Sequence, residues 1–278
     1  METLKGAEVS AKIKEEVQGW LEELGGQIPQ LAIVRVGERP EDLSYERGAL
    51  KKMEQFGLRA TVFAFPADIS DAEFRKEFAT INENVDVTGI LLLRPLPSQI
   101  DEKAIERMID PKKDLDGISP ENIAKVFAGD ESGFAPCTAE AVMEILEKNG
   151  INPAGKRAVV VGRSMVVGRP LAMLLLRANA TVTICHSRTE NLKEVCKNAE
   201  ILAAAIGRAK MLDQEYVGDS AVVLDVGINV DENGKLCGDV DFASLTEKVG
   251  AATPVPGGVG AVTTAVLAKH LVRAALAK

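Results

Sequence analysis

The stretch Ala158–Thr189, AVVVGRSMVVGRPLAMLLLRANATVTICHSRT, decides the fold of this chain. Its first residues, Ala158–Val161, are small or β-branched and apolar, which is typical of a buried parallel strand. An apolar helix is predicted from about Val167 to Arg177, with Pro170 in its first turn, where proline is tolerated. The β-branched run Thr181–Ile184 then completes a strand–helix–strand unit of the length that a parallel crossover needs.

The turn between this strand and helix favours a dinucleotide site. It reads G-x-S-x-x-V-G from Gly162 to Gly168, with Ser164 at the second glycine position of the dinucleotide fingerprint. Small residues are needed there because amides at a helix N-terminus bind a pyrophosphate only if no bulky side chain intervenes. A broken fingerprint is a weak signal by itself, since a plain strand-to-helix turn has the same pattern.

The end of the second strand indicates which dinucleotide is bound. An NAD-binding unit places an acidic residue near this point, for the ribose 2′-hydroxyl. This chain has His186-Ser187-Arg188-Thr189 instead, with Arg163 in the facing turn. Two hydroxyls and two arginines suit a 2′-phosphate better than a free diol, so the predicted cofactor is NADP.

Composition excludes several other classes of protein. The net charge of −8 over 278 residues argues against a nucleic-acid partner. The N-terminus lacks a signal-peptide apolar core, and no apolar run approaches membrane-spanning length. Four cysteines without a CxxC pair and only two histidines favour neither a disulfide framework nor a metal site. We therefore expect a soluble cytoplasmic protein.

The remaining chain alternates predicted strands and helices, which indicates two α/β domains with mostly parallel sheets and a ligand cleft between them. The turn-rich segment Gly129–Pro136 marks the boundary. Residues 1–137 are predicted to form the first domain, completed by a C-terminal helix at 263–278. Residues 138–262 are predicted to form a Rossmann-like nucleotide-binding domain, in which Thr138 caps a helix that carries its apolar stripe over 140–148.

Six motifs, in chain order, resemble those of the methylenetetrahydrofolate dehydrogenase/cyclohydrolase family. They are KDLDG (113–117), PCT (136–138), VVVGRSMVVGRP (159–170), TVTICHSRT (181–189), DVGIN (225–229) and TPVPGGVG (253–260). The resemblance covers nearly the whole chain. It implies a folate in the cleft and NADP on the second domain.

The resemblance also implies roles for single residues. Those expected to contact the cofactor are Gly162, Arg163, Ser164, Ser187 and Ile228, with Thr138 and Thr263 as weaker candidates. Those expected at the folate are Tyr45, Asp116, Pro256 and Gly260.

Two of the folate residues are also the candidate catalytic residues. Tyr45 would stack along the folate, because an aromatic ring can cover a flat substrate. Asp116 would read the pterin edge, since a carboxylate accepts the paired donors of an aminopyrimidine. Both have structural alternatives. Asp116 could serve as a turn or capping residue, and Tyr45 could lie at the margin of a core.

The chain departs from the family pattern at two positions. The family has a lysine one helical turn after the tyrosine, where this chain has Ala49, and a glutamine where this chain has Leu93. Neither replacement can donate, accept or carry a proton. We therefore expect an NADP-dependent dehydrogenase, active in one-carbon metabolism, whose cyclohydrolase activity is weak or absent.

Three alternatives remain open from the sequence. Cyclohydrolase activity could persist through a substitute group such as Lys52, or the chain could bind folate without turnover. A third alternative keeps the nucleotide-binding domain and changes the substrate, as in a shikimate dehydrogenase. The resemblance further implies a homodimer built on the nucleotide-binding domain.

Overall fold

The computed structural model describes residues 1–277, which divide into two compact units. Unit 1 comprises Met1–Lys12 and Pro136–Thr263, and unit 2 comprises Ile13–Ala135 and the residues from Thr264 onward. Two helices, α1 (Gly6–Glu23) and α9 (Val259–Leu276), contribute residues to both units.

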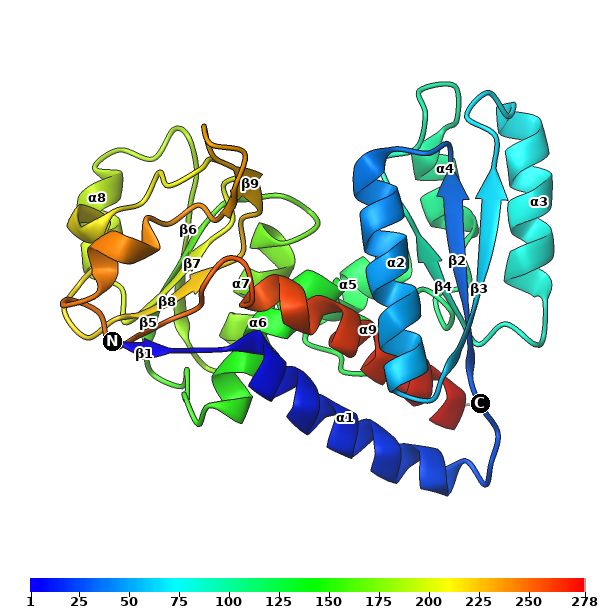
Figure 1. Ribbon diagram of the computed structural model, residues 1–278, viewed down its shortest axis with the longest axis horizontal. Coiled ribbons are helices and arrows are strands. Elements are labelled where there is room, and N and C mark those ends of the chain that lie inside the picture. The colour runs from blue at the N-terminus through cyan, green and yellow to red at the C-terminus, as the bar shows by residue number, and fades with distance from the viewer. Residues whose placement is uncertain (278) are drawn as a thin grey trace. The chain divides into compact units, whose positions relative to one another are not determined.

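Unit 2 contains a three-stranded parallel sheet in the order β3-β2-β4 (Figure 1). The strands are β2 (Gln30–Val36), β3 (Arg59–Phe65) and β4 (Gly89–Leu92). Its other helices are α2 (Pro40–Gln55), α3 (Asp71–Glu83), α4 (Glu102–Met108) and α5 (Pro120–Ala128). Six of the seven residues of β2 are buried, as expected for a central strand whose two faces are both covered.

Alternation along β2 directs its side chains to two different layers. Val34 and Val36 pack in one core cluster with Phe74 of α3. Arg35 points to the other face, where its Nε lies 2.8 Å from Oε2 of Glu46 on α2. Figure 1 accordingly shows α2 and α3 on either side of this sheet.

Unit 1 contains a six-stranded, fully parallel sheet in the order β1-β11-β8-β7-β5-β6. The strands are β1 (Glu2–Thr3), β5 (Arg157–Val161), β6 (Thr181–Cys185), β7 (Ile201–Ala204), β8 (Val222–Asp225) and β11 (Ala251–Ala252). The hairpin of β9 (Asn229–Val230) and β10 (Leu236–Cys237) is antiparallel. The helices are α6 (Cys137–Lys148), α7 (Gly168–Arg177) and α8 (Leu192–Lys197), with short 3-10 helices at Gln214–Tyr216 and Phe242–Leu245.

The order of strands in unit 1 reverses next to β5. The chain passes from β5 through α7 to β6 on one side, and then returns to β7 on the other side of β5. Open parallel sheets bind ligands beyond the carboxyl ends of the strands at such a reversal. The predicted fold class, two α/β units with mostly parallel sheets, is confirmed.

The structure corrects the predicted domain boundary at the N-terminus. Residues 1–12 belong to unit 1, because β1 pairs with β11 in the register Glu2↔Ala251. A two-residue strand at a chain end has no periodicity that a sequence pattern could reveal.

Two predicted helix starts are also corrected. Helix α6 begins at Cys137 with Pro136 as its N-cap, so Thr138 lies inside the first turn and does not cap it. Helix α9 begins at Val259, four residues before the predicted start at Thr263.

Helix α9 also corrects the expectation that no apolar run is long enough to span a membrane. Among the described residues it is the one helix that meets this criterion by length and composition. In this protein, 61% of the helix is buried, as in the core helix of a globular protein.

Candidate functional site

The turn after β5 is shaped for close backbone approach. Gly162 has φ +137°, and a Cβ at this position would overlap the carbonyl oxygen of Ala205, which follows β7. The hydroxyl of Ser164 accepts hydrogen bonds from the amides of Val167 (3.1 Å) and Gly168 (3.4 Å), where α7 begins. This compact turn sits at the strand reversal, where a dinucleotide pyrophosphate binds in such sheets.

The ends of β5 and β6 bring the predicted phosphate-binding residues to one edge. Val161 pairs with Cys185 in the register, so Arg163 follows one strand end while Ser187 and Arg188 follow the other. All three of these side chains are exposed. Two guanidinium groups and a hydroxyl fit the 2′-phosphate of NADP, because arginine binds phosphate through several parallel hydrogen bonds.

His186 has a local role in the turn after β6. Its amide donates to the hydroxyl of Thr189 (2.8 Å), and its Nδ1 accepts from the amide of Arg188 (3.1 Å). These bonds fold the residues after β6 into a tight turn. His186 therefore orders this turn, as expected for a residue at a strand end.

A small pocket of about 200 Å³ lies at the carboxyl end of β8. It brings together Ile228, Pro256 and Gly260, three of the residues predicted at the cofactor and the folate. Ile228 is 65% exposed, and a Cβ on Gly260 would lie 3.4 Å from its Cδ1. The pocket has the size and apolar character for one flat ring.

The two weaker cofactor candidates do not line this pocket. Thr263 is buried in α9, and its hydroxyl donates to the carbonyl of Val259 at 3.3 Å. Thr138 lies partly exposed in the first turn of α6.

The loop that carries Asp116 in unit 2 is held by its neighbours. Buried Asp114 accepts hydrogen bonds from the amides of Ile118 (3.0 Å) and Ser119 (2.7 Å) and from the side-chain amide of Asn122 (2.9 Å). Lys113 donates to the carbonyls of residues 82 and 84, both at 2.7 Å. The turn therefore depends on Asp114, while Asp116 stays partly exposed.

Tyr45 lies partly exposed on α2, in the same unit as Asp116. Ala49, one helical turn later, is fully buried. Leu93 directly follows β4 and is also buried, with its amide donating to the carbonyl of Val34 at 2.9 Å. Both departures from the family pattern are thus aliphatic side chains packed inside unit 2.

Two cationic side chains close in sequence to these positions, Lys52 and Arg94, contact other groups. The Lys52 ammonium lies 5.7 Å from the centre of the Phe56 ring, and burial, with Lys14 and Lys51 nearby, lowers the Lys52 pKa. Arg94 lies 2.8 Å from the carboxylate of Glu106. Burial raises the pKa of Glu106 against the opposing effect of Arg94.

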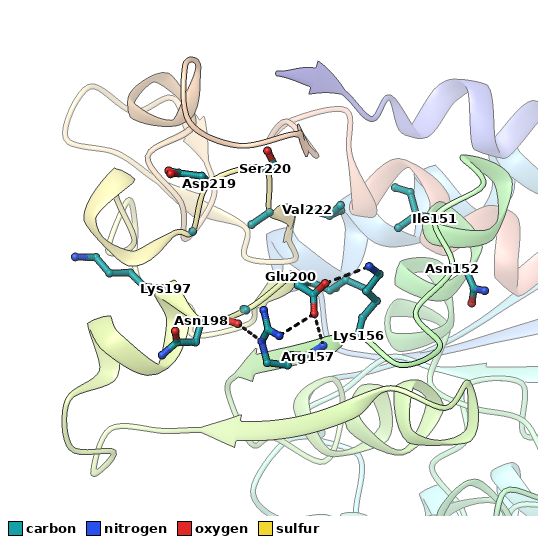
Figure 2. Close-up of a pocket in the computed structure, with 14 residues that line it drawn as sticks. Ile151, Asn152, Lys156, Arg157, Lys197, Asn198, Glu200, Asp219, Ser220 and Val222 are labelled. Atoms are coloured by element: carbon teal, nitrogen blue, oxygen red, sulfur yellow. Dashed lines mark hydrogen bonds and ion pairs between the residues drawn. The ribbon is translucent and has the colours of Figure 1, made fainter.

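A second cavity in unit 1, of about 420 Å³, lies at the opposite edge of the sheet (Figure 2). It is lined by the first residues of β5, β7 and β8, so it faces away from the carboxyl ends of the strands. Glu200 lies 3.1 Å from the Lys156 ammonium and 3.4 Å from the Arg157 guanidinium. The hydrogen bond from the Arg157 amide, followed by the contacts with these two cations, lowers the pKa of Glu200.

Two buried carboxylates, Asp225 and Asp239, were not predicted as functional residues. Asp225 is the first residue of the DVGIN motif, but the motif does not show that its side chain is buried. Asp239 lies in a polar, turn-rich segment that carries no periodic pattern.

A parallel sheet with a strand reversal, a small-residue turn at that reversal and one arginine after each of β5 and β6 indicate an enzyme that depends on a nicotinamide dinucleotide. Residues 136–278 match the description "Tetrahydrofolate dehydrogenase/cyclohydrolase, NAD(P)-binding domain", and residues 4–116 match "Tetrahydrofolate dehydrogenase/cyclohydrolase, catalytic domain". The chain belongs to the tetrahydrofolate dehydrogenase/cyclohydrolase family, as the motifs predicted.

Known relatives agree in sequence and structure. The bifunctional protein FolD of Clostridium kluyveri is 51% identical over 275 residues, which cover 98% of this chain and 96% of the relative. The crystal structure of the FolD dehydrogenase/cyclohydrolase of Campylobacter jejuni superimposes with a TM-score of 0.96 at 38% identity, covering 100% and 99% of the two chains. The Trypanosoma brucei dehydrogenase–cyclohydrolase, complexed with NADP and an inhibitor, has a TM-score of 0.88 at 31% identity, covering 98% and 96%.

Proposed function

We propose that this chain oxidises 5,10-methylenetetrahydrofolate to 5,10-methenyltetrahydrofolate with NADP, and that its cyclohydrolase activity is weak or absent. Hydride passes from the bridging methylene of the folate to the nicotinamide and leaves a methenyl cation. The cofactor supplies the hydride acceptor, and the protein supplies orientation. This step needs no general base, so the aliphatic residues at positions 49 and 93 leave it intact.

The preference for NADP over NAD rests on the arginine cluster. Arg163 and Arg188 follow adjacent strand ends, and the residues after β6 include no carboxylate before Glu190. A free 2′-hydroxyl would leave these cations without an anionic partner. The solved Trypanosoma brucei relative, which was crystallised with NADP, is consistent with this preference.

The folate-side proposal rests on Tyr45 and Asp116 in unit 2, with Pro256 and Gly260 at the pocket after β8. The family resemblance assigns the partly exposed carboxylate of Asp116 to the pterin edge, while the neighbouring Asp114 accepts the backbone hydrogen bonds of the turn. Tyr45 offers an aromatic face that is partly accessible.

The observation that carries the proposed weak or absent cyclohydrolase activity is that Ala49 and Leu93 are buried aliphatic side chains, which cannot carry a proton. Hydrolysis of the methenyl cation needs attack by water and movement of protons, and a positioned acid–base group is typically worth about 10² to 10⁴ in rate. Lys52 is placed against Phe56, and Arg94 does not deprotonate in proteins. In the cell, a separate cyclohydrolase would then consume the methenyl product.

One assay tests this function directly. The purified protein is mixed with 5,10-methylenetetrahydrofolate and NADP, and reduced nicotinamide and the methenyl product are followed separately. Equal amounts of both should accumulate, and the same assay with NAD should be much slower. The proposal fails if no reduced nicotinamide forms, or if methenyltetrahydrofolate is hydrolysed as fast as it is made.

The proposal also covers the location, the oligomeric state and the partners of the enzyme. We place the enzyme in the cytoplasm, as a homodimer, with a tetrahydrofolate derivative as its small-molecule partner and with neither nucleic acid nor membrane as a ligand. The net charge of −8 supports the absence of a nucleic-acid partner. Strand β6 supports the dimer, because it is an edge strand of the large sheet with exposed Ile184.

A further inference from the structure

Asp225 and Asp239 are two neighbouring buried carboxylates in unit 1; they are 3% and 0% exposed. Oδ1 of Asp225 accepts from the amides of Gly227 (3.2 Å) and Asp239 (2.9 Å), and its Oδ2 accepts from the amide of Val240 (3.0 Å). Asp225 ends strand β8, so it ties the segment around Asp239 to the carboxyl edge of the sheet.

The carboxylate of Asp239 in turn holds two loops. It accepts from three consecutive backbone amides after β7, those of Ile206 (2.5 Å), Gly207 (3.1 Å) and Arg208 (2.8 Å). It also accepts from the side-chain amide of Asn229 (2.9 Å), which directly follows Ile228. One buried side chain therefore connects the loop after β7 with the loop after β8.

The packing around the pair leaves no room for other side chains. A Cβ on Gly227 would overlap the carboxyl group of Asp239, and a Cβ on Gly238 would overlap that of Asp225. The loop after β8 is thus fixed by hydrogen bonds and by close contact. Seven N–H groups, six from the backbone and one from Asn229, take up the two negative charges in place of water.

The position of these loops along the sheet assigns them to one end of the dinucleotide. The neighbouring strands run in the order β6, β5, β7, β8. With the 2′-phosphate at the end of β6 and the pyrophosphate at the turn after β5, the nicotinamide reaches the ends of β7 and β8. The apolar pocket at Ile228 lies at the end of β8.

We propose that Asp239, held by Asp225, is a positioning residue for hydride transfer. It fixes the loops 206–208 and 227–229, which together seat the nicotinamide ring. The inference rests on the NADP-dependent dehydrogenase activity proposed above. Because the phosphate groups are held at the ends of β5 and β6, loosening this seat impairs the orientation of the ring more than the binding of the cofactor.

The test compares Asp239→Asn and Asn229→Ala with Asn233→Ala, whose exposed side chain lies in the turn of the β9–β10 hairpin. Asp239→Asn replaces one acceptor oxygen by a donor that faces backbone N–H groups. Asn229→Ala removes one hydrogen bond at a partly exposed position, so it remains informative if the first variant does not fold.

Three measurements are made on each variant. Both test variants should lower kcat about tenfold or more, since a small misplacement of reacting groups costs up to about 10² in rate. Their NADP dissociation constants, measured by calorimetry, should change less than threefold. The primary isotope effect with substrate deuterated at the transferred position should rise as hydride transfer becomes slower, and Asn233→Ala should match the unmodified protein in all three.

Amide hydrogen exchange without cofactor tests the same loops independently of activity. Exchange at residues 206–208 should be faster in Asp239→Asn, with the rest of the sheet unchanged. The inference is wrong if kcat and the isotope effect stay at their unmodified values in Asn229→Ala, or if kcat falls only in proportion to NADP affinity. If the unmodified protein does not reduce NADP, the proposed function fails, while the exchange experiment still decides whether Asp239 holds the loop.

Discussion

Arg163 is the residue on which the choice of cofactor depends most directly. Replacing it with alanine should weaken NADP binding much more than NAD binding, because a charge-assisted contact worth about 1.5–3 kcal/mol is lost only with the 2′-phosphate. Calorimetric titration of both cofactors measures the effect, which corresponds to a loss of roughly ten- to a hundredfold for NADP. Arg177→Ala, at the last residue of α7, is the matched control. Equal losses for both cofactors would place Arg163 in another role.

Asp116 and Asp114 stand two residues apart but should respond differently to the same substitution. Asp116→Asn should impair folate turnover and leave NADP affinity nearly unchanged. Asp114→Asn should instead lower the melting temperature, because Asp114 is buried and accepts three hydrogen bonds. Steady-state kinetics and thermal unfolding of both variants separate these effects. If Asp116→Asn has a lowered melting temperature but unchanged specific activity, Asp116 has a structural role and does not bind folate.

Asp225 should make the stability of the protein depend on pH. Burial raises its pKa from 3.8 to about 6, so between these values the folded state binds more protons than the unfolded state. The contribution of this group to the free energy of unfolding is therefore present at low pH and lost as pH rises from about 4 to about 6. The unmodified protein should therefore lose on the order of 2–3 kcal/mol of its free energy of unfolding over this pH range. Asp225→Asn should not show this decrease.

Urea unfolding at several pH values, taken as the difference between the unmodified protein and Asp225→Asn, measures this contribution. The comparison cancels the exposed ion-paired carboxylates, such as Asp71 beside Arg75, whose lowered pKa values act in the opposite direction. A difference that does not change between pH 4 and pH 6 would contradict the assignment.

Helix α2 carries the proposed loss of cyclohydrolase activity, because it presents Tyr45 and, one turn later, Ala49. Ala49→Lys combined with Leu93→Gln should raise hydrolysis of methenyltetrahydrofolate by about 10² or more, and Ala49→Lys alone by less. Both positions are buried, so the longer lysine at 49 and the polar amide at 93 should cost about 1–3 kcal/mol of stability. Ala49→Leu adds similar bulk without a charge, and it should give no gain. If Lys52→Met abolishes hydrolysis in the unmodified background, Lys52 is the substitute group.

The assembled molecule is predicted to be a dimer that forms through unit 1. The edge strand β6 exposes Ile184, and α7, which precedes it in the chain, exposes Leu176. Sedimentation velocity at micromolar concentration should give twice the mass of one chain. Ile184→Lys should shift the protein toward monomer, since an edge lysine opposes strand pairing. Val85→Lys, at a more exposed apolar position in unit 2, should not. A fully active monomer would remove the proposal.

Local pattern in the sequence was enough to predict much of the fold. The strand–helix–strand unit around Gly162 follows from periodicity and turn residues, which act over a few neighbours. The same holds for Arg163 and Ser187, because the carboxyl ends of adjacent parallel strands must meet at one edge. The family followed from six short motifs in order.

Only the tertiary structure decided which residues support these elements. The pairing of β1 with β11, the division of roles between Asp114 and Asp116, and the hold of Asp239 on residues 206–208 all join segments distant in the chain. Such contacts depend on sheet register and on burial. A polar side chain stabilises a loop in this way only where the backbone N–H groups around it are buried away from water. No local pattern distinguishes a buried aspartate from a turn aspartate. The sequence by itself therefore placed Asp225 in a motif but did not show which backbone groups it binds.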